Sequence, residues 1–373
     1  MDFLLPFAPY YYFVYWFIVM LMTIRQYSYI KKCQDYALIK KSFDYQPIIV
    51  FSFFFILFYG FRPFSGVYFG DTPNYAQKYE LLEMFGVFDH QGSDDLGSDW
   101  IFNYLMKYCS QIINVHLWFT IVLSCYIVPM IAGCKLLDSR HGALLFLFCI
   151  CAFEFYSFAV NGIRNGMACS IVILALALLN KGKLIWAIVL SFIALGCHKS
   201  TVLPSVCMFF VFFVRKPKLM FIAWLGAIVI SLAAGNYIDN ILSMFNFDNR
   251  LAGNLQMDEA DGVIIEHRFR WDFLLYSSMP ILLGWYTIFK RKLYDKTYLL
   301  LLGTYMYANS IWVLAIRAMF SNRIAYLSWF IYPIVLAYPL LNLEVFKKKH
   351  SKKTAIIFLA HFGFTTILWL LGK

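Results

Sequence analysis

The chain has 373 residues, of which 61% are hydrophobic and only 14% are charged, and its formal net charge is +11. A soluble chain of ordinary composition carries about 25% charged residues. Because so much apolar surface cannot be hidden in water, the composition excludes a soluble, a disordered or a nucleic-acid-binding protein. The nine cysteines do not indicate a disulfide framework, since most lie inside apolar runs and behave as small hydrophobic residues. We expect no cleavable signal peptide, because Asp2 stands where such a peptide carries basic residues.

Apolar runs that are long enough to cross a membrane recur along the chain. A spanning helix needs about 20 apolar residues. We predict twelve spans, at about residues 7–24, 46–61, 115–134, 142–160, 164–180, 184–197, 201–214, 219–237, 271–289, 297–316, 324–343 and 354–371. The sequence therefore predicts an all-α, polytopic integral membrane protein with a single transmembrane domain over residues 1–373. Two of its connections are long, at residues 62–112 and 238–270.

The basic residues of the connections alternate along the chain. Lys and Arg are retained on the cytoplasmic side of a membrane, and 21 of the 32 basic residues fall in every second connection, beginning with the one after residue 24. These inner connections carry a net charge of +16, and the rest of the chain carries −5. The pattern places both termini and both long loops on the outer side, where we expect the functional site.

Four cations on the outer side stand at predicted helix starts, namely Arg164, Lys199, Arg270 and Arg323. A helix N-terminus carries a partial positive charge, which disfavours a cation there. A bound anion would resolve this conflict, because helix N-termini and Arg side chains together make phosphate sites. The alternative for each one is a cation that reaches a lipid headgroup. As a set they favour a shared polyanion site, with Arg317 as a further candidate.

Arg164 lies in the stretch Asn-Gly-Ile-Arg-Asn-Gly of residues 161–166. The spacing of Gly162 and Gly166 has two interpretations. One is close packing of helices, and the other is a tight turn whose backbone N–H groups approach a pyrophosphate.

Two residues are candidates for a general base. His198 lies at the outer junction of the sixth and seventh spans, and an imidazole is suited to accept a proton from a hydroxyl near neutral pH. The alternative is an interfacial histidine bonded to the backbone or to a headgroup. Glu154 is the only acid well inside an apolar run. Intramembrane acids are costly and usually paired or functional, so we predict that Glu154 pairs with an outer arginine or serves as a second base.

The first outer loop offers groups that suit a sugar. Asp71 stands four residues before Tyr75, and acidic and aromatic groups at a membrane surface suit sugar hydroxyls and rings, although a helix cap is an equal alternative for the Asp. The acidic run of residues 89–99 lacks the EF-hand spacing, and we interpret it as a solvated loop rather than a divalent-cation site. The sequence contains no zinc spacing, nucleotide loop or Ser-His-Asp order, and we predict neither a metal nor a cofactor.

At these positions the chain resembles the EpsG-like branch of the Wzy polymerases, which are bacterial O-antigen and exopolysaccharide polymerases. The resemblance rests on four patches: Gly-Asp-x-x-x-Tyr with Asp71 and Tyr75, Asn-Gly-Ile-Arg-Asn-Gly-Met-Ala at 161–168, His-Lys-Ser at 198–200 and Ser-Asn-Arg-Ile-Ala-Tyr at 321–326. Some Wzy enzymes carry an Arg-x10-Gly pattern in outer loops. We do not carry it over, because Arg250 and Gly262 are one residue out of that spacing.

The resemblance implies a membrane glycosyltransferase with a lipid-linked substrate. A polymerase of this kind transfers a growing glycan from undecaprenyl pyrophosphate to the terminal sugar of a new repeat unit, on the periplasmic face of the bacterial inner membrane. The implied partners are the lipid-linked oligosaccharide, membrane lipids and a chain-length regulator protein, with no nucleic acid. The implied roles are pyrophosphate binding for Arg164, Arg323, Arg270, Lys199 and Arg317, proton transfer for His198 or Glu154, and glycan binding for Asp71 and Tyr75.

Other functions are compatible with parts of this pattern. The main alternative from another class is a flippase or exporter of lipid-linked oligosaccharide. Transporters tend to show repeats and charges near the bilayer midplane, whereas the ionisable residues here cluster at the outer boundary. An O-antigen ligase would differ only in its acceptor. A membrane acyltransferase would meet its cytoplasmic donor on the other side.

Overall fold

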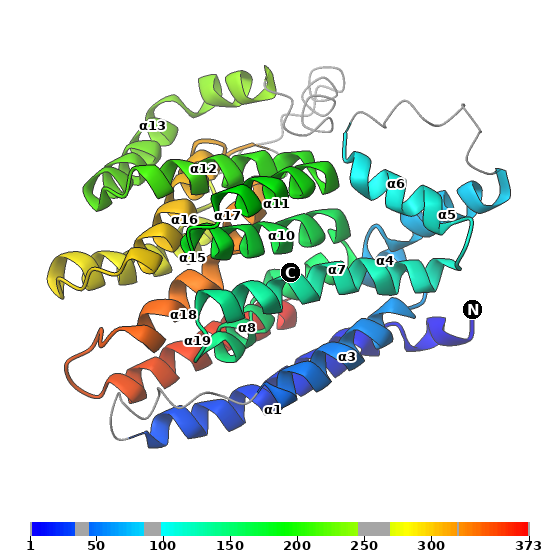
Figure 1. Cartoon of the computed structure of the whole chain (residues 1–373), viewed down its shortest axis with the longest axis horizontal. Helices are drawn as coiled ribbons and strands as arrows, with labels where there is room; N and C mark the ends of the chain where they lie inside the picture. The colour runs from blue at the N-terminus through cyan, green and yellow to red at the C-terminus, as the bar shows by residue number, and fades with distance from the viewer. Residues whose placement is uncertain (1, 34–44, 86–97, 245–268, 319–320, 372–373) are drawn as a thin grey trace. The chain divides into compact units, whose positions relative to one another are not determined.

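The computed structural model describes residues 2–33, 45–85, 98–244, 269–318 and 321–371 (Figure 1). All regular secondary structure in these ranges is helical, as predicted. The chain divides into two compact units, one of Met1–His198 with Leu340–Lys373 and one of Lys199–Pro339. A single transmembrane domain over residues 1–373 stays a prediction.

The first unit contains the helices on which the site is built. In chain order they are η1 (Asp2–Phe7), α1 (Tyr10–Lys32), α3 (Gln46–Gly60), α4 (Gly66–Phe69), α5 (Thr72–Phe85), α6 (Trp100–Cys109), α7 (Val115–Leu137), α8 (Gly142–Ile150), α9 (Phe153–Val160), α10 (Ile163–Asn180), α11 (Leu184–Cys197) and, at the C-terminus, α19 (His350–Leu370). Helix α10 packs against α7, α9 and α11, and α7, α10 and α11 lie side by side in Figure 1.

A glycine on α7 allows α10 to pack closely against that helix. A Cβ at Gly133 of α7 would stand 2.7 Å from Cγ2 of Ile173 on α10, so the two helices approach closely at that glycine. Helix α10 is apolar around most of its circumference, and a helix of that kind is buried. Its first turn carries Arg164, which is thereby fixed on a largely buried helix.

The second unit contains η4 (Lys199–Thr201), α12 (Val202–Phe213), α13 (Pro217–Met244), α15 (Trp271–Trp285), the π-helical turn η5 (Tyr286–Lys290), α16 (Lys296–Leu314), α17 (Ser321–Trp329) and most of α18 (Tyr332–Asn342). Helix α16 packs against α12, α13, α15 and α17. The buried side chain of Asn309 on α16 accepts a hydrogen bond from Trp224 Nε1 at 2.9 Å and donates one to Ser328 at 3.0 Å. These bonds join α13, α16 and α17.

Each of the twelve predicted spans contains a helix, and the prediction of an all-α polytopic membrane protein is confirmed. In the described ranges, five helices are long and apolar enough to cross a membrane: Val115–Leu137, Ile163–Asn180, Pro217–Ala234, Ser321–Asn342 and His350–Leu370. Helices α8 and α9 together would make a sixth, although they are bent by 76°. The apolar helices Gln46–Gly60, Leu184–Cys197 and Lys199–Phe213 are shorter. The count of twelve spans stays a prediction.

Some spans differ from the predicted runs in length or continuity. The run at 142–160 is two helices, because the chain bends at Cys151 and Ala152. The first helix extends to Lys32 instead of ending near residue 24, so its last turn carries Lys31 and Lys32. Cations at a helix C-terminus complement the dipole, which favours this longer helix over the predicted connection.

Candidate functional site

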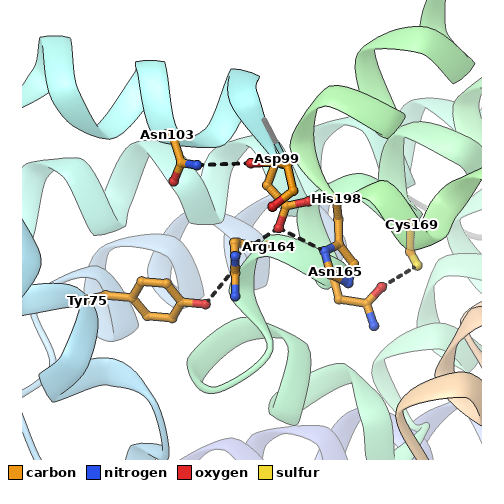
Figure 2. Close-up of polar contacts among 8 residues, drawn as sticks. Tyr75, Asp99, Asn103, Arg164, Asn165, Cys169 and His198 are labelled. Atoms are coloured by element: carbon orange, nitrogen blue, oxygen red, sulfur yellow. Dashed lines mark hydrogen bonds and ion pairs between the residues drawn. The ribbon is translucent and has the colours of Figure 1, made fainter. Parts of the chain in front are cut away.

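Arg164 is the centre of a polar cluster in the first unit. Its Nε donates a hydrogen bond to the hydroxyl of Tyr75 on α5 at 3.0 Å, and its Nη1 donates to Oδ2 of Asp99 at 2.8 Å (Figure 2). Nη2 of Arg164 makes no hydrogen bond within the described part of the chain, and 35% of the side chain is exposed. The guanidinium is therefore held on two sides and open to a ligand on the third.

His198 joins the same cluster from the end of α11. Its Nδ1 lies 3.2 Å from Oδ2 of Asp99, the oxygen that also accepts from Arg164. The imidazole is 23% exposed and the carboxylate only 5%. An imidazole whose Nδ1–H donates to a carboxylate can accept a proton at Nε2. The site thus combines a cation, a base and a shared carboxylate.

Asp99 adopts an uncommon backbone conformation for this role. It is the residue before α6 and has φ 57° and ψ 36°, in the left-handed region that few residues other than glycine adopt. An Asp at this position ordinarily caps its helix through its side chain, but the side chain of Asp99 makes no capping bond. It is directed to Arg164 and His198 instead. Strained backbone of this kind concentrates at functional sites.

Two turns of the chain near this cluster, at residues 71–72 and 160–161, are joined by hydrogen bonds. The backbone N–H of Asp71 donates to Oδ1 of Asn161 at 3.0 Å, and the hydroxyl of Thr72 donates to the carbonyl of Val160 at 2.7 Å. The preceding Gly70 has φ +54°, and a Cβ there would stand 2.2 Å from Asn161 Oδ1. Glycine is therefore required at this position on both counts. Tyr75 and Arg164 follow these two turns by one helical turn each, so the contact between the turns sets the contact between the side chains.

The buried side chain of Arg62 adds further hydrogen bonds to the turn at Thr72. It is 0% exposed, its Nε donates to the hydroxyl of Thr72 at 3.0 Å, and its Nη1 donates to the carbonyl of Tyr59 at 2.7 Å. Its guanidinium also stands 4.3 Å from the ring centre of Phe119. Arg62 thus joins the end of α3 to the start of α5, and it belongs to the support of the site rather than to its surface.

The phenol of Tyr75 is neutral in this environment. Burial raises the pKa of Tyr75, and the nearby Arg164 opposes that rise only in part. A neutral hydroxyl can accept the bond from Arg164 Nε without cancelling its charge. Tyr75 was predicted to bind glycan through its ring. In the structure its hydroxyl orients the arginine, and the predicted glycan contact stays a prediction, as it does for the half-buried Asp71.

The glycines near Arg164 fit the packing interpretation at one position. A Cβ at Gly166 would stand 2.8 Å from the Cβ and from the carbonyl oxygen of Phe158, so α10 rests directly on α9 there. Gly162 is less tightly enclosed, since its Cβ would meet Phe158 at 3.5 Å.

Glu154 pairs with none of the outer arginines that the structure describes, and the predicted pairing was wrong for these residues. The residue lies in the first turn of α9, is 2% exposed, and neither of its carboxylate oxygens has a hydrogen-bond partner in the described ranges. The physical reason is that Glu154 stands at the start of α9, so the length of that helix separates it from the turn that carries Arg164. Its role as a second base stays a prediction.

The other predicted pyrophosphate ligands lie in the second unit. Arg270 precedes α15 and makes a two-pronged ion pair with Asp272, at 3.0 and 2.8 Å, so its helix-start conflict is resolved by a carboxylate of the same helix. Arg317 stands 5.6 Å from the ring centre of Phe269. Lys199 lies in η4 and Arg323 in the first turn of α17, and both are partly exposed. A single site shared with Arg164 stays a prediction.

Sequence reasoning treated Arg164 as a cation without an internal anion, and it missed Asp99. Asp99 was assigned to the solvated run of residues 89–99, most of which, at 89–97, lies outside the described residues. No sequence signal marked Asp99, because the helix that begins at Trp100 was not among the predicted helices. Among the described residues, no group of three or more His, Cys, Asp or Glu side chains is placed to hold a metal ion. All nine cysteines are free, as expected.

One of the comparisons with known proteins gives a family for the chain. No curated protein and no solved structure matched the chain. The model of the EpsG family matches residues 45–372, a range that includes Tyr75, Asp99, Arg164 and His198. The match covers most of the chain, and the protein belongs to the EpsG family.

Proposed function

We propose that this protein is a polysaccharide polymerase of the O-antigen or exopolysaccharide kind. It would join undecaprenyl-pyrophosphate-linked repeat units on the outer face of the bacterial inner membrane. Family membership supports polysaccharide polymerisation in a membrane. The observation that carries the proposal is the meeting of Arg164 and His198 at one carboxylate oxygen, because an anion-binding group then stands beside a base.

The reaction uses these groups as follows. The hydroxyl of the acceptor sugar gives its proton to Nε2 of His198 while its oxygen attacks the anomeric carbon of the donor glycan. The bond from that carbon to the diphosphate oxygen breaks, and lipid diphosphate leaves with the electron pair. Arg164 stabilises the leaving group through its open Nη2, since a guanidinium matches the oxygens of a phosphate. Because diphosphate is already a good leaving group, the arginine suffices for this step.

The position of the cluster supports an outer-face reaction. Tyr75 and Asp99 belong to the first predicted outer loop, Arg164 to the outer start of α10, and His198 to the outer end of α11. The charge pattern predicts that all four lie on one side of the membrane, and their side chains meet in the structure. A lipid-linked donor and a membrane-bound chain-length regulator fit a site at that boundary.

The decisive experiment supplies purified protein with lipid-linked repeat units and follows product length. We expect a ladder of lengthening glycans. His198→Ala should abolish extension while leaving donor binding largely intact, and Glu80→Gln, which removes an exposed charge from α5, should extend normally. Unchanged repeat units in a well-controlled assay would refute polymerase activity. Transfer of a single unit to a different acceptor would indicate a ligase, and movement across vesicles without new bonds a flippase.

A further inference from the structure

Asp99 holds two functional groups at one atom. Oδ2 accepts from Arg164 Nη1 at 2.8 Å and lies 3.2 Å from His198 Nδ1. The carboxylate is 5% exposed, so water screens these interactions little. A buried carboxylate that is neutralised by an arginine stabilises a protonated imidazole less than one that is not. The charge available to His198 therefore depends on how fully Arg164 is engaged by Asp99.

We propose that Asp99 couples donor binding to the strength of the base. In the donor-free protein, Asp99 and Arg164 neutralise each other. When the diphosphate of the donor engages the open Nη2 of Arg164, it competes with Asp99 for the same cation. The carboxylate is then left to His198, where it stabilises the imidazolium that forms as Nε2 takes the acceptor's proton. This inference rests on the proposed function and makes Asp99 a positioning residue that responds to the substrate.

Two features of the chain support this assignment. Asp99 forgoes the capping bond that its place before α6 would allow, and it holds a left-handed backbone conformation to present its carboxylate. The charged and titratable groups around it come from separate elements: Tyr75 from α5, Arg164 from α10, and Cys197 and His198 from the end of α11. Arg164 carries a positive charge and shares the oxygen Oδ2 with His198, so its engagement changes how much of the carboxylate's charge acts on the imidazole.

The test measures binding of farnesyl diphosphate to the full-length protein, with farnesol as the control for the lipid tail. Asp99→Asn suits the test, because Asn tolerates left-handed backbone nearly as well as Asp. If Asp99 competes for Arg164, the variant should bind the diphosphate at least about fivefold more tightly than wild type. Its turnover number should fall at least about tenfold, since the base loses its support. Loss of a merely structural residue would weaken binding instead.

A double-mutant cycle separates this competition from a general loss of negative charge. In an Arg164→Gln background, Asp99→Asn should give no gain in diphosphate affinity, because the effect acts through Arg164. An equal gain in that background, or no gain with Arg164 present, would overturn the inference. Glu80→Gln is the matched control for removal of one exposed acid and should leave affinity unchanged.

The same variant separates the coupling from the proposed function. If Asp99→Asn binds the diphosphate no more tightly than wild type and polymer still forms, the proposed function stands and only the coupling fails.

Discussion

Substitution of Thr72 by valine tests whether the contact between the two turns positions Arg164. Thr72 is 0% exposed, and its hydroxyl accepts from Arg62 Nε at 3.0 Å and donates to the carbonyl of Val160 at 2.7 Å. Valine has nearly the same shape but can make neither bond. The variant leaves a buried guanidinium N–H and a buried carbonyl without these partners.

The cost follows from the two lost bonds. A hydrogen bond to a charged group contributes about 1.5–3 kcal/mol and a neutral one about 0.5–1.5 kcal/mol. We therefore expect Thr72→Val to lower the free energy of unfolding by about 2–4 kcal/mol, which corresponds to a fall in melting temperature of about 3–5 °C for a chain of this length. Because Tyr75 lies one turn beyond Thr72, its bond to Arg164 should loosen, and the KM for the lipid-linked donor should rise.

The assay compares thermal unfolding and donor KM of purified Thr72→Val with those of Thr72→Ser. Serine keeps the hydroxyl and loses only the methyl group, so it should stay close to wild type in both measurements. If the serine variant is as impaired as the valine variant, packing of the methyl group matters and the two hydrogen bonds do not. If neither differs from wild type, the connection through Arg62 has no part in positioning the site.

Two further predictions concern packing and pH. Gly166→Ala should lower stability by about 1–3 kcal/mol, because its Cβ would stand 2.8 Å from the backbone oxygen of Phe158; Gly363→Ala, whose Cβ meets nothing within 4 Å, should be neutral or stabilising, and equal melting temperatures would contradict this. Burial raises the pKa of Asp138, but hydrogen bonds from His141 and Asn342 outweigh it and lower the pKa to about 2. Since the folded value lies below the unfolded one, Asp138 should contribute about 2 kcal/mol above pH 4 that is lost as the pH falls toward 2. Thermal unfolding between pH 6 and 3 should show this loss in wild type and a weaker one in Asp138→Asn.

The fold could be predicted from the sequence because the membrane limits the choices. Backbone groups in lipid must bond within their own segment, so a long apolar run is a helix. The bend between α8 and α9 could not be predicted in this way, because residues 142–160 are mostly apolar and contain no proline or glycine after Gly142. Hydropathy reports whether a segment is buried, and it is insensitive to the direction in which the segment runs.

The site could be predicted in part for an electrostatic reason. Arg164 stood out because a cation at a helix start conflicts with the dipole, and His198 stood out as a titratable group at an outer junction. Asp99 gave no such signal, since an acid beside a helix start agrees with the dipole and reads as an ordinary cap. Its importance comes from a contact across 65 residues of sequence, to Arg164, and another across 99, to His198. Only the folded chain reveals contacts of that range.

The internal carboxylate changes what the site selects. A lone Arg164 at a helix N-terminus would bind any lipid phosphate, and phospholipid headgroups surround a membrane protein at high concentration. With Asp99 bonded to Nη1, the pair is neutral, and a ligand must compete with a carboxylate that is already in place. A phosphodiester headgroup carries one negative charge and offers the guanidinium little more than Asp99 does. A diphosphate carries two negative charges. It would therefore compete with Asp99 for the guanidinium more strongly than a phosphodiester headgroup would. Under the proposed function, the contact that would activate His198 would therefore also favour a diphosphate donor over the bulk lipid.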